Sequence, residues 1–144
     1  MHKEINFEDA IEQALISAGG YTLGNPDDYD SDRALFPADV ITFVQATQPK
    51  FWQRLTDLNK DNAATVLLDS LTKELRSKGM LTILRQGFKC FGKTVRLAYF
   101  EPNTGMNPEA FTRYEQNRLT LTRQLTTATG AIPDIVLAVN GLPI

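Results

Sequence analysis

The hydrophobic positions in the first half of the chain recur with the period of an α-helix. Apolar side chains three and four residues apart follow an expected N-cap at Asn6, which predicts a first helix over residues 6–18. The same period runs through residues 37–75, where it is interrupted at Pro49 and at Asp61. Because proline suits the first turn of a helix and not its interior, we expect three short helices here, the second beginning at Pro49 and the third capped by Asp61.

After Gly79 the pattern changes to short runs typical of β-strands. We expect an antiparallel meander, then a strand whose apolar face is interrupted by Arg123, then a strand apolar on both faces in the middle of a sheet. The residue ranges of these five runs are 81–84, 88–91, 94–100, 119–125 and 132–139. Loops are expected over residues 21–34 and 101–117, the latter with a helical turn at 109–117.

The last strand leads into a tight turn at Asn140-Gly141. This dipeptide tolerates positive φ at both central positions of a type I′ turn, so we expect a two-residue hairpin with Val139 opposite Leu142. In that register Asp134 faces a position roughly three residues beyond Ile144, and Ile144 lies at an unfinished sheet edge.

Together these elements predict one α/β domain of α+β character over residues 1–144. A helical part, about 6–78, precedes a strand-rich part, about 79–144, that forms a mixed sheet. No apolar run reaches the roughly 20 residues that span a bilayer and no signal-peptide pattern is present, so we expect a cytoplasmic protein that does not enter the membrane. Cys90 is the only cysteine, which excludes an internal disulfide and suits a reducing compartment.

Charge is distributed unevenly along the chain. Residues 1–39 hold nine acidic and two basic residues, whereas residues 73–96 hold seven basic residues and one acidic residue. The basic segment is either a solvated face or a surface that meets nucleic-acid phosphates through Lys89, Lys93 and Arg96.

Three residues stand out as candidates for chemistry. Asp134 begins an apolar strand, where an ionised carboxylate needs either backbone hydrogen bonds as a cap or a divalent metal. Glu8 lies at the edge of the apolar stripe of the first helix, with Glu12 farther toward solvent, so Glu8 is the better candidate for a partly buried carboxylate. Arg123 needs a partner, which places it in an ion pair or beside an active-site cleft.

A series of short motifs runs in order along nearly the whole chain. They are Gly20-Tyr21, Tyr29-Asp30, Thr47-Gln48-Pro49-x-x-Trp52, Leu84-Arg85-x-Gly87, Tyr114-x-x-Asn117, Arg123-Gln124, Pro133-Asp134-Ile135-Val136-Leu137 and Asn140-Gly141-Leu142-Pro143-Ile144. In this order they resemble the amino-terminal domain of the restriction (R) subunit of type I restriction enzymes.

The resemblance implies a nuclease of the PD-(D/E)xK type with a restriction-endonuclease-like core. Asp134 would be its metal-binding Asp and Glu8 its first-helix Glu, both serving Mg²⁺-dependent hydrolysis of double-stranded DNA. The partners would be modification and specificity subunits, with ATP used by a motor domain that lies elsewhere, since no phosphate-binding loop occurs here. The family's Glu-x-Lys would begin roughly four or five residues after Ile144, next to the expected register neighbours of Asp134, so we expect an inactive amino-terminal fragment of a larger multidomain chain.

Two other functions fit the sequence. One is a non-catalytic DNA-binding or assembly module of such a complex that docks through the basic segment, residues 73–96. The other is an unrelated α+β structural domain in which Asp134 is only a cap.

Overall fold

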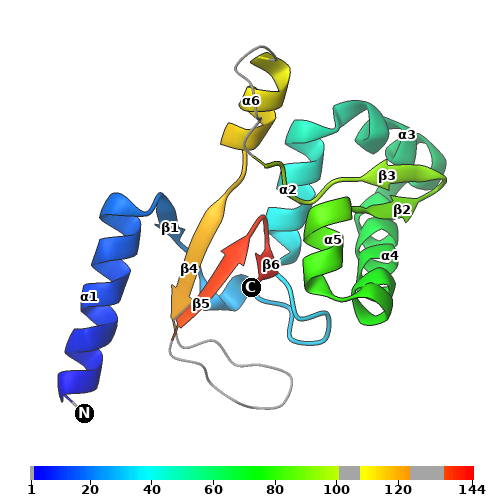
Figure 1. Ribbon diagram of the computed structural model, residues 1–144. Helices are drawn as coiled ribbons and strands as arrows, with labels where there is room; N and C mark the ends of the chain where they lie inside the picture. The colour runs from blue at the N-terminus through cyan, green and yellow to red at the C-terminus, as the bar shows by residue number, and fades with distance from the viewer. Residues whose placement is uncertain (1, 101–107, 124–134) are drawn as a thin grey trace. The chain divides into compact units, whose positions relative to one another are not determined.

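The protein folds as a mixed α/β chain, as its sequence predicts (Figure 1). The computed structural model describes residues 2–100, 108–123 and 135–144, without the side chains of residues 2–8, 110 and 111. Two compact units are present, one made of residues 1–37 with 118–144 and the other of residues 38–117. In the described ranges no helix combines the length and the apolar character needed to cross a bilayer.

The first unit is built on a four-stranded mixed sheet. Its strands are ordered β1-β4-β5-β6, with β1 parallel to β4 and the other neighbours antiparallel (Figure 1). The elements are α1 (His2–Ala18), β1 (Tyr21–Leu23), the 3₁₀ helix η1 (Pro26–Asp28), β4 (Leu119–Arg123), β5 (Ile135–Val139) and β6 (Leu142–Pro143). As expected, β5 lies inside the sheet, between β4 and β6, although four of its five side chains are only half-buried.

Two predictions for the start of the chain are wrong. The first helix begins at His2, so Asn6 lies inside it and is not its N-cap. The loop expected over residues 21–34 begins with β1, in which Tyr21 pairs with Leu119 and Leu23 with Leu121. A three-residue strand is too short to show a period, and its hydrogen-bonding partner lies almost a hundred residues away, so no local signal marks it.

The hairpin at Asn140-Gly141 is confirmed in turn type and register. Asn140 has φ 51° and Gly141 has φ 88°, and Val139 pairs with Leu142. The turn is also buried: the Asn140 side-chain Oδ1 accepts a 2.7 Å hydrogen bond from the backbone N–H of Arg118. Gly141 O accepts one of 2.8 Å from Phe36. The Asn-Gly pair therefore reverses the chain and is also hydrogen-bonded to the residue before β4 and to the residue before α2.

A small apolar cluster covers β5 in this unit. Phe36 and Ala138 are buried together, with Tyr29 and Val136 packed against them. The rings of Tyr29 and Phe36 meet edge to face with centroids 5.2 Å apart. Burial, together with the charge of neighbouring Asp30, raises the pKa of Tyr29, so its hydroxyl stays neutral.

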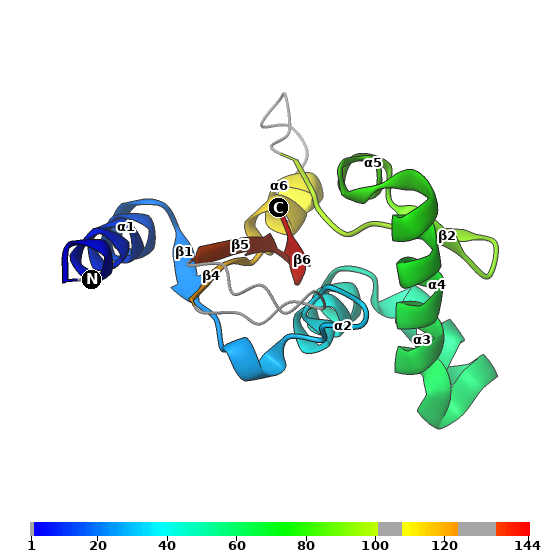
Figure 2. The same cartoon turned by 90° about the horizontal axis from the view of Figure 1, so that it is seen from below.

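The second unit is mainly helical, and the three helices expected between residues 37 and 75 are confirmed. Its elements are α2 (Pro37–Thr47), α3 (Pro49–Asn59), the 3₁₀ helix η2 (Lys60–Asn62), α4 (Ala63–Lys78), α5 (Met80–Gln86), β2 (Phe88–Cys90), β3 (Lys93–Val95) and α6 (Pro108–Glu115). Proline begins α3 as predicted, whereas the N-cap of α4 is Asn62 and not Asp61. The long helix α4 contacts α3, α5 and β2 (Figure 2). It buries Leu67, Leu68 and Leu71.

The three-stranded meander predicted after Gly79 is wrong. Residues 81–84 lie in helix α5, which leaves a two-stranded hairpin of β2 and β3, and β3 ends at Val95. A four-residue apolar run fits a buried helix turn as well as a strand, and here Ile83 is buried while Leu81 is 62% exposed. Helix α6 confirms the helical turn expected near residues 109–117.

Candidate functional site

The structure describes the elements that carry the two predicted catalytic carboxylates but not the carboxylates themselves. Asp134 lies outside the described residues, and so does the side chain of Glu8, whose backbone belongs to α1. Ile135, the residue that follows Asp134 in the sequence, begins β5 opposite Arg123 at the end of β4. Helix α1 contacts β1 at the edge of the same sheet.

Arg123 confirms the ion-pair half of its prediction. Its Nη1 lies 2.6 Å from Oδ1 of Asp9 and 3.9 Å from Oε2 of Glu12, and its side chain is only 21% exposed. Since Arg123 also pairs with Ile135 across the sheet, it places acidic groups of α1 at the end of the sheet where β5 begins. A position beside an active-site cleft, the other half of that prediction, stays a prediction.

Glu12, which the sequence places farther toward solvent than Glu8, is half-buried. Its side chain is 23% exposed, about as buried as that of Arg123, while Ala14 and Ala18 of the expected apolar stripe are exposed. Over residues 9–18, the part of α1 whose side chains are described, the half-buried residues are Ile11, Glu12 and Leu15. Arg123 accounts for the difference, because a partly buried cation attracts the carboxylates of the helix that lies beside it.

The described carboxylates do not form a metal centre by themselves. Among the residues that the structure describes, no three His, Cys, Asp or Glu side chains gather closely enough to hold an ion. Asp9 and Glu12 share one guanidinium, and two carboxylates supply few of the oxygens that octahedral Mg²⁺ requires. A metal site at this end of the sheet therefore needs further oxygen ligands, of which Asp134 is the sequence candidate.

Cys90, the single cysteine, is buried in β2. Burial raises the pKa of its thiol, and a hydrogen bond with Ser70 opposes the rise only in part. Because the thiolate is the reactive form, this environment fits a structural thiol and not a nucleophile.

The three basic residues predicted to meet nucleic acid are all exposed around the β2–β3 hairpin. Lys89 lies in β2 and Lys93 in β3, and Arg96 follows β3. Their environments differ, because Lys93 and Arg96 line a pair of adjoining cavities and Lys89 lines neither.

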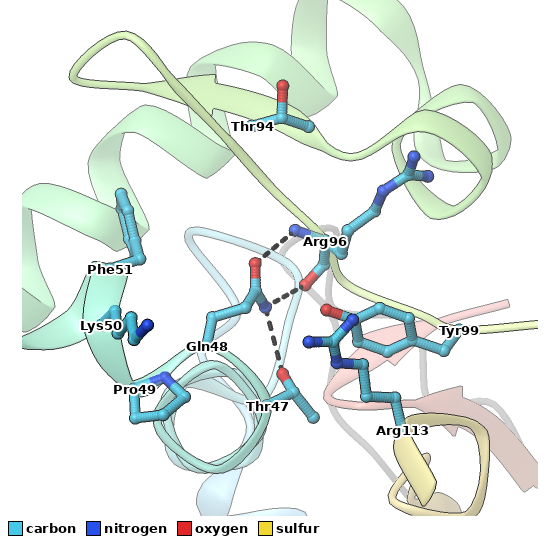
Figure 3. A pocket seen from close by; sticks show the side chains of 9 residues that line it. All are labelled: Thr47, Gln48, Pro49, Lys50, Phe51, Thr94, Arg96, Tyr99 and Arg113. Carbon is cyan, nitrogen blue, oxygen red and sulfur yellow. Dashed lines mark hydrogen bonds between the residues drawn. The ribbon is translucent and has the colours of Figure 1, made fainter. Parts of the chain in front are cut away.

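These two cavities, of about 420 and 320 Å³, form what we call the α3–β3 cleft, and Figure 3 shows the larger of them. They share four lining residues, so they lie side by side. The shared residues are Gln48, Lys50, Phe51 and Thr94. The remainder of the lining is Thr47, Pro49, Arg96, Tyr99 and Arg113 in the larger cavity and Arg54 with Lys93 in the smaller one. Five of these eleven residues are basic and none is acidic.

The side chain of Gln48 holds the two walls of the cleft together. Its Oε1 accepts a 2.8 Å hydrogen bond from the backbone N–H of Arg96, and its Nε2 donates to Arg96 O at 2.9 Å and to Thr47 Oγ1 at 3.1 Å (Figure 3). Asn117 pairs in the same way with both backbone groups of Tyr99. The segment after β3 is thus hydrogen-bonded to two amide side chains, which gives the cleft a fixed wall.

Sequence reasoning missed three cations of the cleft. Lys50 and Arg54 are four residues apart on α3, which places them on one face of the helix, but nothing in the sequence indicates what that face meets. Arg113 comes from α6, where its guanidinium lies 5.9 Å from the centre of the Tyr99 ring. Gln48 and Asn117 do belong to motifs noted in the sequence, and here those motifs serve the wall of the cleft.

Comparisons of the chain with protein-family models, with curated proteins and with solved structures found no match. Its class is therefore defined by its own fold, a mixed α/β protein with a four-stranded mixed sheet in one unit and a basic cleft in the other.

Substitution of Arg123 by Ala should lower stability modestly. The pair with Asp9 is partly exposed, since Asp9 is 52% exposed, so its loss is worth about 1 kcal/mol or less. A double-mutant cycle of Asp9→Ala and Arg123→Ala, measured by urea unfolding, should show coupling of that size. DNA binding should be unchanged, and a selective loss of binding without a loss of stability would instead assign Arg123 to the nucleic-acid surface.

Proposed function

We propose that this chain is the amino-terminal part of a Mg²⁺-dependent DNA endonuclease of the kind found in the R subunit of type I restriction enzymes. The observation that carries the proposal is the order of elements in the first unit: α1, β1, β4, β5, the type I′ turn and β6, with all four strands in one mixed sheet. This order contains, in sequence, the helix, the two neighbouring strands and the hairpin that the family resemblance implies for a restriction-endonuclease-like core.

The ion pair of Arg123 supports the same proposal. It brings the acidic face of α1 to the end of the sheet at which β5 begins, directly after Asp134 in the sequence. The proposed metal ligands are Asp134, one carboxylate of α1 and the Glu of a Glu-x-Lys motif on the continuation of the sheet. Glu8 is the helix residue that the sequence favours, and the half-buried position of Glu12 makes it an equal candidate.

In this proposed site the residues of the chain bind the metal or position its ligands. Asp134 and the α1 carboxylate hold the cation, while Arg123 acts as a positioning residue through its contact with α1. When bound, Mg²⁺ supplies an activated water and stabilises the leaving oxygen of a phosphodiester. Double-stranded DNA is the proposed substrate, with modification and specificity subunits as partners and an ATP-driven motor in another part of the protein.

A non-catalytic DNA-binding module is the second candidate. The α3–β3 cleft favours it, because five basic residues line a cavity with no acidic neighbour in the lining. The two candidates differ in whether a Glu-x-Lys follows Ile144 in the gene, since a catalytic site needs it and a binding module does not.

The proposal is tested by DNA cleavage. The 144-residue chain holds no Glu-x-Lys after Asp134, so with Mg²⁺ it should leave plasmid DNA intact. A protein that continues through a Glu-x-Lys strand should bind the metal and, with its partner subunits, cut DNA. Strong metal-dependent cleavage by the 144-residue chain would contradict this arrangement of ligands. A gene that ends at the codon for Ile144 would contradict the whole proposal.

A further inference from the structure

The cations of the α3–β3 cleft have few partners within the protein. Among the residues that the structure describes, no ion pair involves Lys50, Arg54 or Lys93, and all three side chains are exposed. Arg96 donates to the backbone oxygen of Arg85, and Arg113 lies against the ring of Tyr99. None of the five basic groups is therefore neutralised by a described carboxylate.

This arrangement is unfavourable for folding alone. Like charges gathered around one concave surface repel each other, and low-dielectric walls strengthen the positive potential inside. Lys50 adds to the cost, because it lies in the first turn of α3, where the helix dipole favours negative charge and no acidic residue is present. A bound anion would remove both penalties.

The shape of the cleft distinguishes an extended anion from a compact one. The basic groups do not converge on one point: Lys50 and Arg54 lie along α3, Lys93 and Arg96 follow the opposite strand, and Arg113 reaches in from α6. In Figure 3, Lys50 and Phe51 lie on one side of Gln48, and Arg113 and Tyr99 on the other. A chain of phosphates fits such a row of charges better than a single phosphate does.

The one amide side chain of the lining that could read a base edge is already engaged. The amide of Gln48 is already hydrogen-bonded to Arg96 and Thr47. What remains is positive charge, the Thr94 hydroxyl and the half-buried ring of Phe51, and cations combined with an aromatic surface are typical of grooves that hold a single nucleic-acid strand. Cavities of about 420 and 320 Å³ have the size of small-molecule sites, which is too small to enclose a duplex.

We infer that the α3–β3 cleft binds the phosphate backbone of one nucleic-acid strand without sequence preference. This site lies wholly in residues 38–117 and is separate from the proposed nuclease centre in the first unit. Of the three basic residues that the sequence predicted to meet nucleic acid, the cleft contains Lys93 and Arg96 but not Lys89. The cleft also contains three basic residues that the sequence did not predict, Lys50, Arg54 and Arg113.

The experiment compares two double charge reversals in the 144-residue chain by fluorescence anisotropy of a short labelled oligothymidylate. The cleft variant is Lys50→Glu with Lys93→Glu. The matched control is Lys73→Glu with Lys89→Glu, which changes the net charge equally at exposed positions outside the cleft. Circular dichroism should show the same fold for both variants and the parent chain.

The cleft variant should bind at least about tenfold more weakly than the parent chain at low salt. The slope of log K against log salt should fall by about 1.4, since each phosphate contact on a single strand contributes about 0.7. The control variant should change affinity by less than about threefold. Equal losses in both variants, or the absence of salt-dependent binding by the parent chain, would overturn the inference.

Inorganic pyrophosphate and a duplex of equal length separate the possible ligands. The single strand should bind more tightly than either, and pyrophosphate should compete only weakly. If pyrophosphate binds more tightly than the oligonucleotide and the cleft variant loses that binding, the ligand is a small phosphate compound and the assignment to nucleic acid is wrong. Neither result depends on Asp134, so failure here leaves the nuclease proposal untouched.

Discussion

Replacement of Asp134 by Asn in a cleavage-competent form of this protein should reduce Mg²⁺-dependent DNA cleavage by about a hundredfold or more. In the proposed site, a bound Mg²⁺ would contribute several kcal/mol of transition-state stabilisation, and each 1.36 kcal/mol is worth a factor of ten in rate. Asn keeps the size of the side chain and one carbonyl oxygen but removes the negative charge that, on this proposal, holds the cation. The measurement is single-turnover cleavage of plasmid DNA with the partner subunits present.

A second readout separates a metal ligand from a strand cap. Mn²⁺ or Mg²⁺ should raise the melting temperature of the unsubstituted, cleavage-competent protein but not that of its Asp134→Asn variant. The reason is that a metal ion stabilises a protein when it binds the folded state and not the unfolded state. Asp57→Asn is the control, since Asp57 is an exposed carboxylate on α3 that accepts a hydrogen bond from Gln53. If Asp134→Asn lowers stability without affecting cleavage or the metal-induced shift, Asp134 is only a cap.

Gly87→Ala should destabilise the second unit by about 2–6 kcal/mol. Gly87 has φ 73° and ψ −166°, a region essentially restricted to glycine, and a Cβ there would lie 2.3 Å from the backbone oxygen of Val95. Backbone strain of about 1–3 kcal/mol then adds to a steric clash of similar size with an atom that cannot rotate away. Urea unfolding followed by circular dichroism measures the loss.

Gly79→Ala is a matched control for the clash. Gly79 has φ 85° and ψ 158°, in the same glycine-only region, but a Cβ there would meet no atom within 4 Å. It should therefore cost only the strain, about 1–3 kcal/mol, and remain folded. Equal losses for the two variants would show that close packing against β3 contributes nothing at Gly87.

The elements with local signals could be predicted from the sequence. Pro49 begins α3 because proline lacks the N–H that a helix interior needs, and Asn140-Gly141 forms a type I′ turn because both residues tolerate positive φ. The same two-residue turn sets the pairing of Val139 with Leu142, because turn length fixes the register of a hairpin. Each of these signals acts over a few residues and does not depend on the remainder of the fold.

Elements whose partners are distant in sequence could not be predicted in this way. Strand β1 is defined by its pairing with β4. The apolar run at residues 81–84 fits a helix or a strand locally, and in the fold it is helical with Ile83 buried. The face that α1 turns toward the sheet also depends on a residue distant in sequence, because Arg123 of β4 forms ion pairs with Asp9 and Glu12.

The two candidate sites differ in the same way, since one was indicated by local sequence and the other only by the fold. The sequence by itself singled out Asp134 as a charge directly before an apolar run, because the cost of burying an unpaired carboxylate is a property of the residue and its immediate neighbours. Only the tertiary structure decided which cations share the α3–β3 cleft, since α3, β3 and α6 contribute them from separate parts of the chain. Electrostatic potential depends on distance in space, and that distance is set by folding and not by position along the chain.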